Sequence, residues 1–132
     1  MPLRLKLRPN ERVVINGCVI RNEDRQTVLT VGNFAQILRE KDILQPEQAT
    51  TPGRAVYFRI QLLLLGEGDA AALRTDAAAA LGRLHQAFAA SEGARQRVAE
   101  AAAALEREDY YKALAALREL FAHEDRVLSA AT

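Results

Sequence analysis

The spacing of the apolar residues changes once along this chain, near residue 51. Before that point apolar and charged residues alternate, as in the run LRLKLR at residues 3–8. After it apolar residues recur every three or four positions, and about a third of the residues from 66 onward are alanine. Alternation is typical of a strand with one buried face, whereas the second spacing and alanine favour helices. The chain is therefore predicted to be α+β, with a small antiparallel β-sheet at the N-terminus followed by a C-terminal antiparallel helical bundle.

Residues 1–50 are predicted to form the β-rich, basic region. Asn16-Gly17 supplies the two positive φ angles of a type I′ hairpin between Arg12–Ile15 and Cys18–Arg21. The run QTVLTV at residues 26–31 is rich in β-branched residues, and FAQILREKDIL at 34–44 predicts a short strand followed by a loop. Short strands joined by such turns predict a meander, in which each strand pairs with the next.

Residues 51–132 are predicted to form the helical region. Thr51 before Pro52 is a good N-cap, so a linking helix should span 52–65 and end at Gly66. Alanine-rich helices should follow over about 69–130, with N-terminal caps at Asp69, Ser91 and Asp109. The apolar stripe of the last helix is expected to consist of Tyr110, Leu114, Leu117, Phe121 and Leu128. Stripes of this width fit a bundle with close, alanine-lined contacts.

Several function classes find no support in the sequence. The longest apolar runs are too short to cross a membrane, and the alternating start lacks the continuous apolar block of a secretory signal, so we expect a cytoplasmic protein without a membrane partner.

Cys18, the single cysteine, is expected to be a small core residue. The G-x-G-x-x-A run at 66–71 reads as a helix end followed by a new cap, because its acidic residues would repel a pyrophosphate. His85 and His123 lack partners at metal-ligand spacing. We therefore expect no enzyme, no cofactor and no metal.

The charge is unevenly distributed along the chain. Residues 1–65 hold ten Lys or Arg against six Asp or Glu, whereas residues 66–132 hold eight against eleven. The cations of the first strand have two interpretations. They could guard a sheet edge against aggregation, or they could contact the phosphates of a nucleic acid.

Three ordered blocks resemble the flagellin repressor FlbT, a family of small regulators of flagellum biosynthesis. They are LRLKLRPNERVVINGCVIRN at 3–22, ILREKDIL at 37–44 and ATTPGRAVYFRIQLLLL at 49–65. The resemblance implies post-transcriptional control, in which the protein associates with the 5′ untranslated region of flagellin messenger RNA and promotes its turnover. It also implies a second small flagellar protein, FlaF, that opposes it. Some relatives activate, so the direction of regulation stays open.

The run Leu5 to Gly17 is also similar to the opening of the carbon storage regulator CsrA, a small β-rich RNA-binding dimer. In this chain Arg8 matches a basic position and Glu11 the turn glutamate of that family. Leu7 and Asn10 depart from its pattern, which has Arg and Gly there. The run LRE at 38–40 resembles a later Arg-Glu segment, and this resemblance implies that Arg39 lies on the same surface as the first strand.

Two hypotheses of function follow. In the first, a cationic strand face binds the flagellin messenger leader and represses it. The residues expected to contact RNA are Arg4, Lys6, Arg8, Arg12 and Arg39. In the second, the chain is a protein-binding adaptor or chaperone-like module for flagellin or FlaF, which would dock on the stripe of the last helix. Because the sheet is too small to stand alone comfortably, it should pack on a helix or pair with another subunit. We also expect a homo-oligomer, most simply a homodimer.

Overall fold

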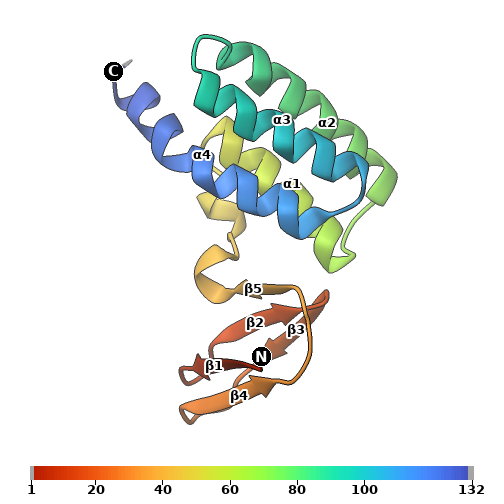
Figure 1. Ribbon diagram of the computed structural model, residues 1–132, viewed down its shortest axis with the longest axis vertical. Helices are drawn as coiled ribbons and strands as arrows, with labels where there is room; N and C mark the ends of the chain where they lie inside the picture. Colours follow the sequence, from red (N-terminus) through yellow and green to blue (C-terminus); the bar gives the residue numbers. More distant parts are fainter. Residues whose placement is uncertain (1, 131–132) are drawn as a thin grey trace. The chain divides into compact units, whose positions relative to one another are not determined.

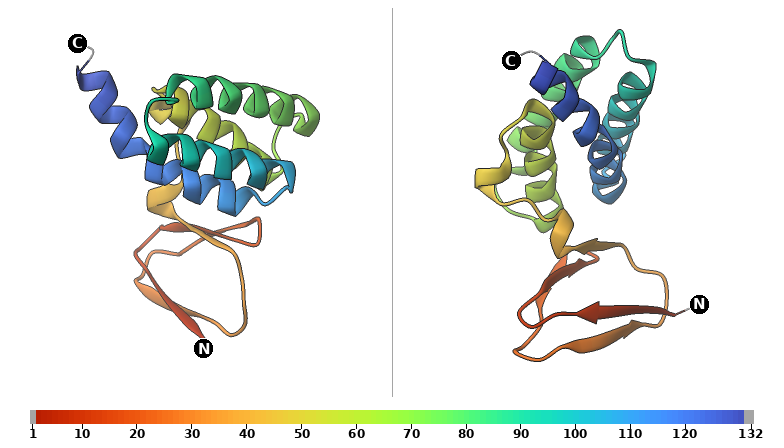
Figure 2. Two further views of the ribbon diagram at one scale, coloured as in Figure 1. Left: turned by 45° about the horizontal axis from the view of Figure 1, so that its top comes forward. Right: turned by 90° about the vertical axis from the view of Figure 1, so that its left-hand side faces the viewer.

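The computed structural model describes residues 2–130, which divide into two compact units between residues 43 and 44. Within the described residues, the first unit holds five short strands and the second holds four α-helices (Figures 1 and 2). All strand pairs are antiparallel. The predicted α+β class, strands first and helices after, is confirmed.

The five strands form two sheets (Figure 1). In one, β1 (Leu3–Leu7) pairs with β4 (Thr27–Val31); in the other, β2 (Arg12–Ile15) lies between β3 (Cys18–Arg21) and β5 (Ile37–Arg39). The hairpin at Asn16-Gly17 is confirmed, with φ angles of 49° and 81°. The predicted meander is wrong, because β1 pairs with β4 and not with β2.

Burial explains why β1 pairs with β4 and not with β2. Leu5 and Leu7 pack with Val13 of β2 in one buried cluster, so the two sheets cover each other's apolar faces. If β1 continued the sheet of β2, that face would lack a cover in so small a unit. The partly buried residues around this cluster are Ile15, Ile20, Leu29, Val31 and Ile37.

Two sequence expectations fail in this unit. Cys18 is exposed, because it begins the edge strand β3 directly after the hairpin turn. Leu3, which alternation places on the buried face, is 48% exposed, because it lies at the end of a two-stranded sheet. The buried face of β1 therefore consists of Leu5 and Leu7.

Short 3₁₀ turns at Glu40–Asp42 and Pro46–Gln48 precede the helices. The helices are α1 (Pro52–Leu65), α2 (Ala70–Ala87), α3 (Glu92–Glu106) and α4 (Tyr110–Ala130). The predicted caps are confirmed, because the side chains of Thr51, Asp69, Ser91 and Asp109 accept hydrogen bonds from the first-turn amides. Gly66, at φ 72°, ends α1 in the left-handed conformation. The G-x-G-x-x-A run is thus a helix end and a new cap.

No helix within residues 2–130 is long and apolar enough to cross a membrane.

The helices form an up-and-down bundle in which α1 packs on α2 and α4, and α3 packs on α2 and α4. Leu114 and Leu117 of the predicted stripe are fully buried, so these two residues belong to the core of the helical unit. Leu128 is 43% exposed, and its assignment to the stripe is wrong. Figure 2 gives the reason, since the last turns of α4 extend past the neighbouring helices.

A buried carboxylate joins the two ends of the helical unit's sequence. Glu124 of α4 is 2% exposed, and it accepts hydrogen bonds of 2.6 Å from both the Thr51 hydroxyl and the Gly53 amide. A Cβ on residue 53 would lie 2.7 Å from a Glu124 carboxylate oxygen. Next to it, Arg54 forms two hydrogen bonds with Asp125, of 2.7 and 3.0 Å. The end of α4 therefore caps the start of α1.

Candidate nucleic-acid interface

The outward face of β1 carries two solvated cations. Because the strand alternates, Leu5 and Leu7 are buried while Arg4 and Lys6 are exposed on the other side. Their neighbours across the sheet are Thr30 and Val28, which carry no charge. Neither Arg4 nor Lys6 forms an ion pair within the part of the chain that the structure describes. Both cations are therefore available to an anionic ligand.

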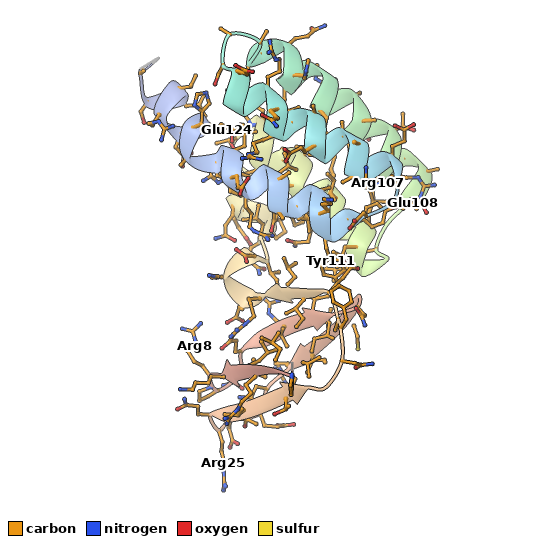
Figure 3. The ribbon with its side chains drawn as sticks, in the orientation of Figure 1. Arg8, Arg25, Arg107, Glu108, Tyr111 and Glu124 are labelled. Carbon is orange, nitrogen blue, oxygen red and sulfur yellow. The ribbon has the colours of Figure 1, made fainter. Side chains whose placement is uncertain are left out.

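The turn after β1 is built around a buried carboxylate. Asn10 adopts the left-handed conformation at φ 63°, which brings Glu11 back toward the end of the strand. Glu11 is 5% exposed, and it accepts a hydrogen bond of 2.9 Å from the Arg8 amide. The Arg8 side chain reaches the same carboxylate at 3.5 Å but stays largely exposed, and Figure 3 shows it directed away from the sheets.

Arg39 links the two sheets. It pairs with Val13 across the ladder of β2 and β5, which places its side chain on the face that covers β1. One guanidinium nitrogen donates to the Lys6 carbonyl at 3.0 Å and to Glu11 at 3.2 Å. Its Nε atom is buried and has no hydrogen-bond partner among residues 2–130. Arg39 therefore holds β1 in place and has less freedom to follow a ligand than the strand cations have.

Arg12 is partly neutralised by Glu40. The Glu40 carboxylate accepts a hydrogen bond of 3.2 Å from the Arg12 amide and lies 3.6 Å from its guanidinium. Arg8 approaches the other oxygen of Glu40 at 3.7 Å. Such half-exposed pairs are weak and are screened by salt, so these arginines keep some capacity to contact phosphate.

Four cations surround a shallow cavity of about 320 Å³ at the junction of β1 and β5. It is lined by Lys6, Arg8, Glu11, Arg39 and Lys41. Glu11 is the single carboxylate in this lining, and it is already bonded to Arg8 and Arg39, so the positive charge dominates. The cavity thus offers ammonium and guanidinium donors suited to phosphate oxygens. The structure brings together three of the five predicted contacts, Lys6, Arg8 and Arg39, leaves Arg4 further along β1, and places Arg12 beside Glu40.

Sequence reasoning missed two residues with functional potential. Lys41 joins the cavity because the 3₁₀ turn after β5 bends the chain back, and its place two residues after Arg39 was the available signal. Phe34 is 88% exposed in the loop between β4 and β5. This loop leaves the sheet where Val31 pairs with Leu3, next to Arg4. An exposed aromatic ring can stack on a base.

The pKa of the Glu11 carboxyl is lowered, first by the hydrogen bond from the Arg8 amide, and further by the Arg39 guanidinium, while burial opposes the shift. A lowered pKa means that the ionised form stabilises the fold above the ordinary value of 4.5, and that this contribution is lost as the pH falls through the folded-state pKa. We expect Glu11→Gln to destabilise the N-terminal unit at pH 7 and to make its stability less dependent on pH below 4.5. Hydrogen exchange of the β2 amides would measure both effects. An equal pH dependence in the two proteins would contradict this role of Glu11.

Comparisons with known proteins add independent information. The family model described as "Flagellar protein FlbT" matches residues 3–128. The "Flagellum biosynthesis repressor protein FlbT" of Caulobacter vibrioides is 40% identical over 128 residues, which is 97% of this chain and 90% of the relative. The "Probable flagellum biosynthesis repressor protein FlbT" of Rhodopseudomonas palustris is 36% identical over 129 residues, 98% of this chain and 99% of the relative. No solved structure matches. The names of these relatives describe a repressor and no catalytic activity.

Proposed function

Since the chain belongs to the FlbT family of flagellar proteins, we propose that it regulates flagellum biosynthesis after transcription, by binding the 5′ untranslated region of flagellin messenger RNA. The bound leader would be withheld from translation and directed to decay. The relatives' names support the regulatory role. The cationic face of the N-terminal unit supports RNA as the ligand.

The observation that carries the RNA assignment is the pair Arg4 and Lys6 on one exposed strand face without counter-charges. Residues 1–43 hold eight Lys or Arg against five Asp or Glu, while the rest of the chain holds ten against twelve. A polyanion is therefore attracted to the N-terminal unit, where contacts to successive phosphates release counterions and supply most of the affinity.

The same unit indicates how bases would be read. Phe34 is its single aromatic residue, so stacking is limited to about one base and a general single-strand platform is disfavoured. Single-stranded loops and bulges present both phosphates and splayed bases. We therefore infer a leader in which a short unpaired element meets the strand cations and Phe34.

An electrophoretic mobility shift with the purified protein and a labelled flagellin leader RNA tests this function. We expect a shifted complex that unlabelled leader displaces at lower concentration than an unrelated RNA of equal length. A leader that stays unshifted at low salt would contradict direct RNA binding. Addition of purified FlaF in a parallel lane would show whether that protein changes the complex.

A further inference from the structure

Four strand edges of the N-terminal unit lack a partner strand among the described residues, namely those of β1, β3, β4 and β5. Unpaired edges invite association with another chain, and proteins protect them with charges, proline or short length. β1 contains Arg4 and Lys6, and Arg39 donates a hydrogen bond to one of its carbonyls. β3 contains Arg21, while β5 is three residues long and contains Arg39.

The edge of β4 has none of these protections. Its sequence, TVLTV, is uncharged and is five residues long. Val28 and Thr30 are exposed, and no backbone hydrogen bond apart from those to β1 involves Val28, Leu29 or Thr30. The β-branched residues Val and Thr are the ones that strands favour. β4 is thus the free edge best suited to pair with another strand.

The β4 sequence is also complementary to itself. In an antiparallel pair centred on Leu29, each Thr27 would lie opposite Val31 of the second copy and each Val28 opposite Thr30. Leu29 would then meet its own counterpart, and no like charges would oppose each other. We propose that two copies of this chain associate through β4, so that two two-stranded sheets become one four-stranded sheet with two-fold symmetry.

Incomplete burial in the single copy supports this partner. Leu29 and Val31 face the buried cluster of the unit but remain only partly buried, and no strand within residues 2–130 pairs with the free edge of β4 beside them. A second β4 would cover them with its own Leu29 and Val31. The buried cluster of the single unit has only three residues, which is a small core for a unit of this size.

Charge does not oppose the pairing. The two β1 strands would be separated by three strand spacings, about 14 Å. This distance exceeds the Debye length of about 8 Å at physiological ionic strength, so repulsion between the two rows of Arg4 and Lys6 is largely screened. Both rows would lie on the same outward face, because Arg4 and Lys6 occupy the side of the sheet that Thr30 and Val28 share. The dimer does not depend on the proposed function. Its consequence, a doubled cationic surface for RNA, rests on the proposed function.

Two measurements on the full chain without RNA test the dimer. Sedimentation equilibrium of the wild-type protein, from about 1 μM to 1 mM, covers the range of weak to moderate association. We expect a reversible increase from 14.5 kDa to twice this mass. A protein that remains a monomer over this range would overturn the proposal.

Disulfide trapping tests the register. In a Cys18→Ser background, Leu29→Cys should form a covalent dimer on oxidation, because the two Cα atoms opposite each other lie about 5 Å apart. Val31→Cys is the matched control, since residue 31 and its counterpart would be about 14 Å apart along the strands. Cross-linking at both positions with equal yield, or at neither, would overturn the interface.

A mixture keeps the test valid if Leu29→Cys fails to fold. Thr27→Cys and Val31→Cys, each in the Cys18→Ser background, should cross-link to each other when mixed but not when alone. Mixed cross-links no more frequent than those of either variant alone would overturn the register. Because no RNA is present, failure here leaves the RNA proposal intact, and failure of the mobility shift leaves the dimer intact.

Discussion

Glu124→Ala is expected to lower the free energy of unfolding of the helical unit by about 3 kcal/mol, since it removes the buried acceptor of two hydrogen bonds. The Thr51 hydroxyl and the Gly53 amide, each 2.6 Å from this carboxylate, would lose their partner. Urea unfolding followed by far-ultraviolet circular dichroism reports mainly on the helices and measures the loss. Asp125→Ala is the matched control, because Asp125 is exposed and should matter less.

Gly53→Ala adds a sharper test of the same contact. The new Cβ would lie 2.7 and 2.9 Å from the two Glu124 oxygens, so the substitution should destabilise the wild-type protein by about 2 kcal/mol. In the Glu124→Ala background the obstruction is gone. There, Gly53→Ala should be neutral or stabilising by up to about 1 kcal/mol, because alanine favours helices over glycine. The same sign and size in both backgrounds would contradict the contact.

The double variant Arg4→Ala, Lys6→Ala is expected to bind the flagellin leader about 15-fold more weakly at about 0.15 M salt. Each phosphate contact to a single strand contributes roughly 0.7 to the slope of log K against log salt, which amounts to about fourfold in affinity at this salt concentration. Both side chains are exposed and lack ion pairs within residues 2–130, so their removal should leave the fold unchanged. Fluorescence anisotropy with labelled leader RNA measures the affinity.

Arg83→Ala, Arg126→Ala is the matched control for this variant. Both arginines are exposed on α2 and α4, and neither forms an ion pair within the described part of the chain. The control removes the same charge from the helical unit, so general electrostatic attraction is reduced equally. An equal loss of affinity in the two double variants would contradict a localised RNA surface. Arg39→Ala is less suitable, because its bonds to Lys6 and Glu11 support the fold.

Local chemistry made the helical half predictable. Thr51, Asp69 and Ser91 each precede a run of helix formers, and a side-chain oxygen in that place satisfies the first free amides wherever the helix packs. Gly66 ended α1 for an equally local reason, since glycine adopts the left-handed conformation without steric cost. The α+β class followed from these signals together with the alternation of β1.

Strand pairing depends on contacts between distant residues, and this is where prediction failed. Alternation showed that Leu5 and Leu7 are buried but not which surface covers them. A meander and the observed pairing of β1 with β4 satisfy the same alternation, and the choice depends on Val13 covering the leucines. Glu124 was missed for a similar reason. A glutamate near a helix end is expected to be exposed to solvent, and only its contact with the start of α1 shows otherwise.

The candidate site was predictable in part. Arg4 and Lys6 follow from period two alone, since the residues between buried leucines must be exposed. Only the resemblance to CsrA predicted that Arg39 belongs to the site. The structure adds that its guanidinium donates a hydrogen bond to the Lys6 carbonyl. For Lys41 the sequence offered only its nearness to Arg39, and for Phe34 it offered no signal, because their positions depend on the turn after β5 and the loop after β4.

The salt dependence of leader RNA binding tests the central claim most directly. If three to five of the cations Arg4, Lys6, Arg8, Arg12 and Arg39 neutralise phosphates, log K for the wild-type protein should fall with log salt at a slope of about −2 to −3.5. Removing Arg4 and Lys6 should make that slope shallower by about 1.4, while the Arg83 and Arg126 control keeps the wild-type slope. A slope near zero, or an unchanged slope in the Arg4 and Lys6 variant, would contradict RNA binding by the strand face.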